Sequence, residues 1–205
     1  MLHLSTIDPP TLELLKKLMS FDEFSGLRLV GGTALALQIG HRKSIDLDFF
    51  GKVDFEAIQT GSLFARFDTV EVIQKTKNIN VFEINGVKVD FVNYSYPWLQ
   101  DTLVIDGIRL ALEKDLAAMK IAAITGRGRK KDFVDMYFLL KEISFTDIIS
   151  LYNEKYFDAS TYLALKSLTY FDDAEQDMDL DMIEPIEWIE VKKTILKEVK
   201  DYSGV

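Results

Sequence analysis

The chain has 205 residues, a formal net charge of −9, no cysteine and two histidines, His3 and His41. The absence of cysteine excludes disulfides, thiolate metal sites and cysteine nucleophiles, and it fits a reducing compartment. The two histidines, one of them in a terminus that we expect to fray, argue against a zinc site or a serine–histidine triad, so carboxylates and lysines remain for chemistry. The negative charge opposes non-specific binding of nucleic acid.

No segment approaches the roughly 18 to 20 uninterrupted apolar residues of a membrane span, and residues 1–5 do not begin a secretion signal. We therefore expect a cytoplasmic protein with no membrane partner. Charge is concentrated in two places, the basic residues 126–131 and the acidic residues 172–181. The acidic segment is interpreted as a solvated loop or, alternatively, as a rim that faces a partner or the substrate exit.

In the first half of the chain, short apolar runs alternate with turn residues. A helix is expected after Asp8, which precedes two prolines, and a hairpin is expected where Asn85-Gly86 supplies a two-residue turn. The other predicted elements, in chain order, are strand Leu27–Val30, helix Thr33–Ile39, strand Ser44–Phe50, helix Phe55–Phe64, strand Thr69–Gln74, and the hairpin strands Ile79–Ile84 and Val87–Val92.

The composition becomes strongly helical beyond Pro97, where apolar residues recur at helical spacing. Helices are predicted over Leu110–Thr125, Asp132–Ile143, Thr146–Lys155, Thr161–Tyr170 and Trp188–Val199. Together these elements predict an α+β fold, in which a mixed β-sheet flanked by helices covers residues 1–109 and an α-helical C-terminal lobe covers residues 110–205, packed as one compact unit.

Three aspartates are candidates for a metal site. Asp46 and Asp48 are two positions apart on the predicted strand Ser44–Phe50, so both carboxylates project from one face, with Cβ atoms roughly 7 Å apart. Asp90 lies on the second hairpin strand and adds a third carboxylate if the two strands are neighbours. Three such side chains repel one another unless cations neutralise them, so the pattern favours Mg²⁺ or Mn²⁺. Exposed strand-end aspartates without function are the alternative.

The residues just before the predicted helix Thr33–Ile39 and just after it are candidates for binding phosphate. Gly31, Gly32 and Thr33 precede a predicted helix, and glycines let backbone N–H groups at a helix N-terminus approach phosphate oxygens. A simple tight turn is the alternative interpretation. Arg42 and Ser44 could hold phosphate oxygens or the loop that carries Asp46, or they could belong to a solvated basic turn.

The helical half contributes one lysine and two aspartates. Lys120 lies among apolar residues of a predicted helix and needs a negative partner, which a triphosphate would provide; a snorkelling surface lysine is the alternative. Asp132 is either the N-cap of the following helix or a functional group. Asp135, one turn further on, could accept hydrogen bonds from Arg127 or Arg129.

Five segments, in this order along the chain, together resemble the AbiEii/AbiGii toxin family of the DNA polymerase β-like nucleotidyltransferase superfamily. They are Gly31-Gly32-Thr33-Ala34-Leu35, Arg42-Lys43-Ser44-Ile45-Asp46-Leu47-Asp48-Phe49-Phe50, Val89-Asp90-Phe91-Val92, Asp115-Leu116-Ala117-Ala118-Met119-Lys120 and Arg127-Gly128-Arg129-Lys130-Lys131-Asp132-Phe133-Val134-Asp135-Met136-Tyr137.

The resemblance implies a minimal nucleotidyltransferase fold, an NTP substrate and Mg²⁺. Its motifs fall on Gly32 and Thr33 for the glycine motif, on Asp46 and Asp48 for the metal, on Lys120 for the basic motif, and on Lys131 and Asp132 for the later lysine–aspartate pair. Members are often the toxin half of a type IV toxin–antitoxin pair in phage abortive infection, and some relatives add nucleotides to tRNA 3′ ends. An RNA or protein acceptor and an antitoxin that acts without a stable complex are therefore the expected partners.

The leading hypothesis is an enzyme that transfers a nucleotide from an NTP to a hydroxyl. Asp46 and Asp48 would bind metal, Asp90 would be a ligand or the general base, and Lys120 would contact the triphosphate, with Asp132 orienting Lys120 or the acceptor. A non-catalytic nucleotide-binding or partner-binding module of the same fold is the alternative. A metal-dependent phosphodiesterase using the same aspartates is a third possibility.

Overall fold

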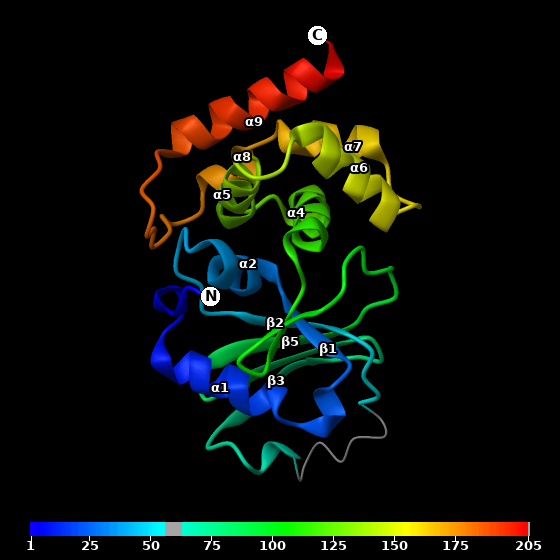
Figure 1. The fold of residues 1–205 in the computed structure, drawn as a ribbon. Coiled ribbons are helices and arrows are strands. Elements are labelled where there is room, and N and C mark those ends of the chain that lie inside the picture. The colour runs from blue at the N-terminus through cyan, green and yellow to red at the C-terminus, as the bar shows by residue number, and fades with distance from the viewer. Residues whose placement is uncertain (56–62, 205) are drawn as a thin grey trace. The chain divides into compact units, whose positions relative to one another are not determined.

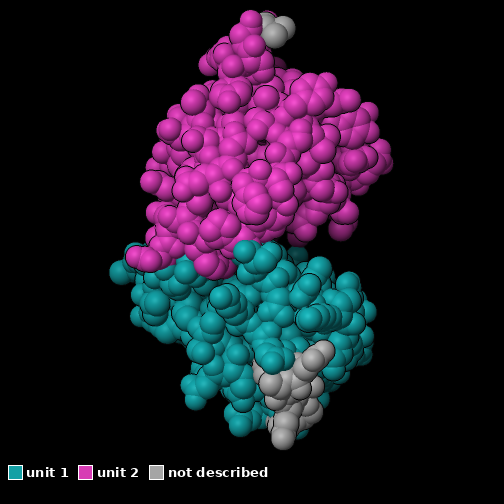
Figure 2. Space-filling view, turned by 90° about the vertical axis from the view of Figure 1, so that its right-hand side faces the viewer, with its two compact units in different colours: residues 1–95, 102–111 teal, residues 96–101, 112–205 magenta. Residues whose placement is uncertain are grey.

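The computed structural model describes residues 1–55 and 63–204. Two compact units form, the first from residues 1–95 and 102–111 and the second from residues 96–101 and 112–205 (Figure 2). Compared with the boundary expected after residue 109, residues 110 and 111 belong to the first unit and residues 96–101 to the second. The predicted helix Phe55–Phe64 falls largely outside the described residues.

The first unit is built on a seven-stranded mixed sheet in the order β3-β4-β5-β2-β1-β7-β6 (Figure 1). Pairing is antiparallel except for the parallel pairs β2 with β5 and β1 with β7. The strands are β1 (Leu27–Val30), β2 (Leu47–Gly51), β3 (Val70–Lys75), β4 (Ile79–Ile84), β5 (Val87–Asn93), β6 (Leu103–Ile105) and β7 (Ile108–Leu110). The predicted strands are therefore present, and β2 is the one whose start differs most from the expectation.

Two helices lie on opposite faces of this sheet (Figure 1). Helix α1 (Pro9–Met19) begins where the Asp8 carboxylate accepts a hydrogen bond from the Thr11 N–H, and helix α2 (Gly31–Ile39) ends at Gly40 in the left-handed conformation. Two 3₁₀ turns, η1 (Leu4–Thr6) and η2 (Asp22–Phe24), precede and follow α1.

Aromatic side chains fill the core on one face of the sheet. Phe91 stacks on Phe49 with ring centroids 5.3 Å apart, and Phe24 of η2 lies 4.8 Å from Phe91. Because side chains alternate along a strand, the buried Phe49 and Phe91 direct Asp48 and Asp90 to the other face. Core packing on one face thus determines which residues the opposite face presents.

Two of the hairpins turn through residues with positive φ. Asn85 and Gly86 have φ values of 52° and 78°, as expected for the two-residue turn between β4 and β5. The same geometry recurs at Asp106 and Gly107, with φ of 51° and 79°, between β6 and β7. This second hairpin was not predicted. Its last residue is Leu110, where a helix was expected to begin, and helix α4 begins at Glu113 instead.

The second unit is helical, as predicted. Its helices are α4 (Glu113–Arg127), α5 (Lys130–Leu139), α6 (Phe145–Lys155), α7 (Thr161–Leu168), α8 (Asp172–Glu175) and α9 (Trp188–Ser203). Helix α5 begins two residues earlier than expected, so Asp132 lies inside the helix and the N-cap interpretation of Asp132 is wrong. None of the helices in the described part of the chain is long and apolar enough to cross a membrane.

A buried ion pair ties the segment before β6 to the helical unit. The Lys155 ammonium lies 2.7 Å from Oδ1 of Asp115, with both side chains fully buried, and it donates to the Pro97 carbonyl at 2.6 Å. The Asp115 carboxylate also accepts from the backbone N–H groups of Leu99 and Gln100, at 3.0 Å each. These bonds explain why residues 96–101 belong to the second unit.

Replacement of Lys155 by methionine should destabilise the helical unit, because it leaves the Asp115 carboxylate buried without its cation. We expect the free energy of unfolding to fall by about 3–5 kcal/mol in urea titrations followed by circular dichroism. Lys197→Met is the matched control, since Lys197 pairs with Asp201 at 3.6 Å on the surface, and its effect should stay within about 0.5 kcal/mol. Equal losses in the two variants would contradict this assignment.

Candidate active site

Two of the three predicted aspartates are direct neighbours in the sheet. Strand β2 runs parallel to β5 with Asp48 in register with Asp90, the adjacency on which the sequence argument depended. Neighbouring strands are separated by about 4.7–4.9 Å, so the two carboxylates emerge side by side on the face away from the aromatic core.

Asp46 lies just before β2 rather than on it. The strand begins at Leu47 instead of Ser44, and Ile45, inside the predicted strand, is 62% exposed. The backbone of this segment bonds to other parts of the unit: the Ser44 N–H donates to the Thr6 carbonyl at 2.9 Å, and the Thr33 hydroxyl contacts the Asp46 carbonyl. These contacts draw the segment away from the sheet.

A short hydroxyl chain anchors this loop to α2. The Thr33 hydroxyl, which is buried, lies 2.8 Å from the Ser44 hydroxyl and contacts the Asp46 carbonyl. A carbonyl can only accept and Thr33 has one proton, so Thr33 donates to Asp46 and accepts from Ser44. In this arrangement Thr33 and Ser44 hold the Asp46 loop, one of the two roles expected for Ser44.

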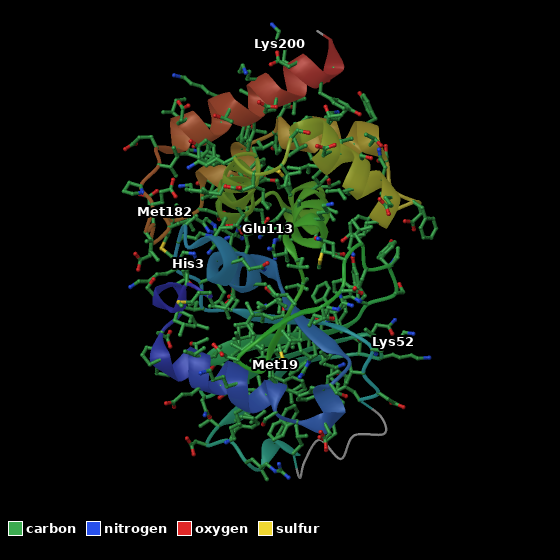
Figure 3. The ribbon with its side chains drawn as sticks, viewed as in Figure 1. His3, Met19, Lys52, Glu113, Met182 and Lys200 are labelled. Carbon is green, nitrogen blue, oxygen red and sulfur yellow. The ribbon has the colours of Figure 1, made fainter. Side chains whose placement is uncertain are left out.

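The N-terminal segment supports the same loop from the other side. The His3 N–H donates to the Leu37 carbonyl at 2.8 Å, and the Thr6 hydroxyl donates to the His3 carbonyl at 2.7 Å. Figure 3 shows His3 beside helix α2. Since the Thr6 carbonyl accepts from Ser44, the first residues of the chain are part of the framework of the site and are not frayed.

The two glycines at the start of α2 lie close against charged side chains. A Cβ atom on Gly31 would lie 2.1 Å from a carboxylate oxygen of Asp48, and Gly31 has φ of +70°. A Cβ on Gly32 would lie 2.2 Å from a guanidinium nitrogen of Arg42. The N-terminus of the nine-residue helix α2 therefore opens directly beside the Asp48 carboxylate, where its partial positive charge is favourable.

The basic turn before β2 is only partly solvated. Arg42 is 3% exposed and donates to the Lys43 carbonyl at 2.9 Å, whereas Lys43 is exposed. A solvated turn is therefore the wrong description of Arg42, whose guanidinium lies against Gly32. Positive charge and helix N–H groups meet at this point, which suits an anionic ligand.

Asp90 is engaged by a lysine of its own strand. The Lys88 ammonium lies 2.7 Å from each carboxylate oxygen of Asp90. Within residues 1–55 and 63–204, no three acidic or histidine side chains are arranged as ligands of one ion. The set of Asp46, Asp48 and Asp90 as joint metal ligands thus stays a prediction.

The other predicted residues form a buried charge network in the helical unit. Lys120, 4% exposed, lies 3.1 Å from Asp132 and 2.6 Å from Asp135, and both carboxylates are fully buried. Arg127 donates to both oxygens of Asp132 at 2.8 and 3.0 Å. Lys120 is therefore not a snorkelling surface lysine, and the cation found beside Asp135 is Lys120.

The pKa of Asp132 is lowered from its ordinary value. Burial by itself raises this pKa, but the charge of Lys120 and the hydrogen bond and charge of Arg127 together outweigh burial. The carboxylate therefore remains ionised in the folded protein at neutral pH and at moderately acidic pH.

The basic and acidic segments of the sequence contact each other. Arg129 pairs with Asp177 at 2.6 Å, and the backbone N–H of Lys130, at the start of α5, donates to the same carboxylate at 2.8 Å. The Lys130 ammonium donates to the Asp177 carbonyl and lies 3.2 Å from Asp179. Asp177 thus caps α5 from a distant part of the chain, a structural role that neither interpretation of the acidic segment included.

Acid should weaken the helical unit through Asp132. A carboxyl whose pKa is depressed on folding contributes stability that is present above its unfolded pKa and lost as the pH falls through the folded value. We expect the free energy of unfolding to decrease below about pH 4, with a shallower decrease in Asp132→Asn, in urea titrations between pH 7 and pH 3. Asp201→Asn, on the exposed surface, should keep the wild-type slope. Parallel slopes for wild type and Asp132→Asn would refute the attribution.

The sequence matches a known family and one similar protein. Residues 13–113 match the sequence model of a family described as "Nucleotidyl transferase AbiEii toxin, Type IV TA system". The matched range contains the glycine turn and all three aspartates. The uncharacterized protein aq_aa25 of Aquifex aeolicus (strain VF5) is 35% identical over 196 residues, which are 93% of this chain and 94% of that protein.

Solved structures share the fold. MenT4, the nucleotidyltransferase toxin Rv2826c from Mycobacterium tuberculosis H37Rv, aligns with a TM-score of 0.60 and 16% identity over 92% of this chain and 80% of its own. JHP933 from Helicobacter pylori aligns with a TM-score of 0.54 and 18% identity over 97% of both chains. With the family match and the 35% identical relative, these findings place the chain in the AbiEii nucleotidyl transferase toxin family and make it a nucleotidyltransferase.

Proposed function

We propose that the protein is a Mg²⁺-dependent enzyme that transfers a nucleotide from an NTP to a hydroxyl of an RNA or protein acceptor. The observation that carries this proposal is the direct register of Asp48 with Asp90 on parallel strands, beside the glycine-opened N-terminus of α2. This places paired carboxylates next to groups that suit phosphate, the combination that nucleotidyl transfer needs.

The neighbouring carboxylates of Asp48 and Asp90 are the pair that suits a hard divalent cation. Carboxylate oxygens are the ligands that Mg²⁺ prefers, and Mn²⁺ accepts the same donors. Asp90 already holds a cation, since both of its oxygens contact the Lys88 ammonium. We assign Asp46, Asp48 and Asp90 to the metal, and the ion, when bound, would neutralise charge that develops on the triphosphate.

The groups around this site have different proposed roles. Gly31, Gly32 and Arg42 present backbone N–H groups and a guanidinium to the phosphates, and Thr33 and Ser44 hold the Asp46 loop through their hydroxyls. In the transfer step the acceptor oxygen forms a bond to the α-phosphorus, the bond from that phosphorus to the pyrophosphate oxygen breaks, and the acceptor proton passes to the Asp90 carboxylate.

Two further candidate residues, Lys120 and Asp132, belong to the helical unit. Lys120 is the candidate for contacting the triphosphate, and Asp132, 3.1 Å from its ammonium, is the candidate for orienting it. The pair of carboxylates around Lys120 keeps the ammonium in one position and supports a positioning role for Asp132.

The biological role that we propose is that of a toxin in a type IV toxin–antitoxin system. The description of the matching family supports this role, and so does the toxin MenT4 among proteins of the same fold. In such a system we expect an antitoxin that acts without a stable complex with this chain, in the cytoplasm, and an acceptor such as tRNA or a protein.

The decisive test is incubation of the purified protein with each α-³²P-labelled NTP, Mg²⁺ and total cellular RNA. We expect label on RNA or on protein with at least one NTP, and Asp48→Asn and Asp90→Asn should each reduce its rate by about 10²-fold or more, because they remove ligands and a general base. Asp22→Asn, an exposed aspartate of η2, is the matched control and should retain the wild-type rate.

Other outcomes separate the competing functions. NTP binding without label on any acceptor would support the non-catalytic module instead. Hydrolysis of nucleic acid in the absence of NTP would support a metal-dependent phosphodiesterase. Label that persists in Asp48→Asn and Asp90→Asn would show that a different site performs the transfer.

A further inference from the structure

Lys88 stands between two acidic side chains on the face of the sheet that carries the proposed site. It is two residues before Asp90 on β5, so both side chains project from the same face, and its ammonium contacts both Asp90 oxygens at 2.7 Å. Directly across on β4, Glu83 is in register with Lys88. Residues directly opposite in an antiparallel pair also share a face, so Glu83 is a second partner within reach.

The ion pair with Asp90 has a clear electrostatic reason. Asp90 lies beside Asp48 in the adjacent parallel strand, and two neighbouring carboxylates repel each other. An ammonium on Asp90 relieves this repulsion when no metal is present. The contact is half-open to solvent, because the Lys88 side chain is 46% exposed and that of Asp90 is 23% exposed, so the pair can separate at little cost.

We propose that Lys88 is a built-in counter-ion of the active site, which neutralises Asp90 in the absence of a divalent cation and moves to Glu83 when one binds. The inference rests on the proposed function, since it takes Asp90 as a metal ligand. Lys88 then sets the concentration of Mg²⁺ at which the site fills, because the ion has to displace its ammonium. Glu83 favours the metal-bound state by receiving the displaced lysine.

Substitutions of Lys88 and of Glu83 should change the affinity for metal in opposite directions. Lys88→Met removes the competing cation and a repulsive charge, so the Kd for Mn²⁺, measured by isothermal titration calorimetry, should fall about two- to five-fold. Glu83→Gln removes the alternative partner of Lys88 and should raise this Kd by a similar factor. Lys88→Arg keeps the charge and should stay close to the wild-type Kd.

Thermal unfolding supplies a second readout that does not depend on activity. Without metal, Lys88→Met should have a lower Tm than wild type, because Asp48 and Asp90 then repel each other without compensation. Addition of Mn²⁺ should raise its Tm by more than it raises that of wild type. A lysine with a purely structural role would lower the Tm equally with and without metal, and this result would overturn the proposal.

The aspartate variants distinguish failure of this inference from failure of the proposed function. If Asp48→Asn and Asp90→Asn bind Mn²⁺ as wild type does, or if wild type binds none, the metal site itself is wrong and the inference falls with it. If those variants lose Mn²⁺ while Lys88→Met leaves the Kd unchanged or raises it, the metal site stands and the counter-ion role of Lys88 is refuted.

Discussion

The parallel pairing of β2 with β5 is the constraint on which the proposed active site depends. It joins two segments that are far apart in the chain and sets Asp48 and Asp90 side by side, against their electrostatic repulsion. Three neighbouring features accommodate this negative charge. Gly31 has no side chain and so leaves space for the Asp48 carboxylate, and the N-terminus of α2 places partial positive charge beside it. The Lys88 ammonium contacts the Asp90 carboxylate. The aromatic packing on the opposite face stabilises the sheet and offsets the repulsion between the two carboxylates.

The helical unit solves a similar problem with permanent partners. Its buried carboxylates are each matched by a cation held at a fixed place, as in the pairs Lys155–Asp115 and Lys120–Asp132. Buried pairs of this kind contribute little net stability but penalise any packing that separates them. Lys88 differs from these buried lysines, because its ion pair with Asp90 is exposed and can exchange partners.

Much of the fold could be predicted from local sequence signals. For the candidate site, the sequence indicated the residue types, but most of their contacts could not be predicted. Strong turn chemistry at Asn85-Gly86 and helical spacing beyond Pro97 correctly predicted the hairpin and the main helices. The second hairpin has an equally strong turn signal at Asp106-Gly107, but no element was predicted there. The contact of Lys120 with Asp132 was among the expected possibilities. The bonds of Arg127 to Asp132 and of Asp177 to the start of α5 were not predicted, because they depend on tertiary contacts between residues with no regular spacing.

The tight turn at Asn85-Gly86 has a consequence for how the chain tolerates length changes. It fixes the pairing of β4 with β5, in which Val81 lies opposite Asp90 and Asn80 opposite Phe91. Side chains alternate along a strand, so a slip of one residue would place Asp90 in the aromatic core and Phe91 in water. A one-residue slip at this turn would therefore disturb the core and the proposed active-site face together, because the same alternation of side chains determines both.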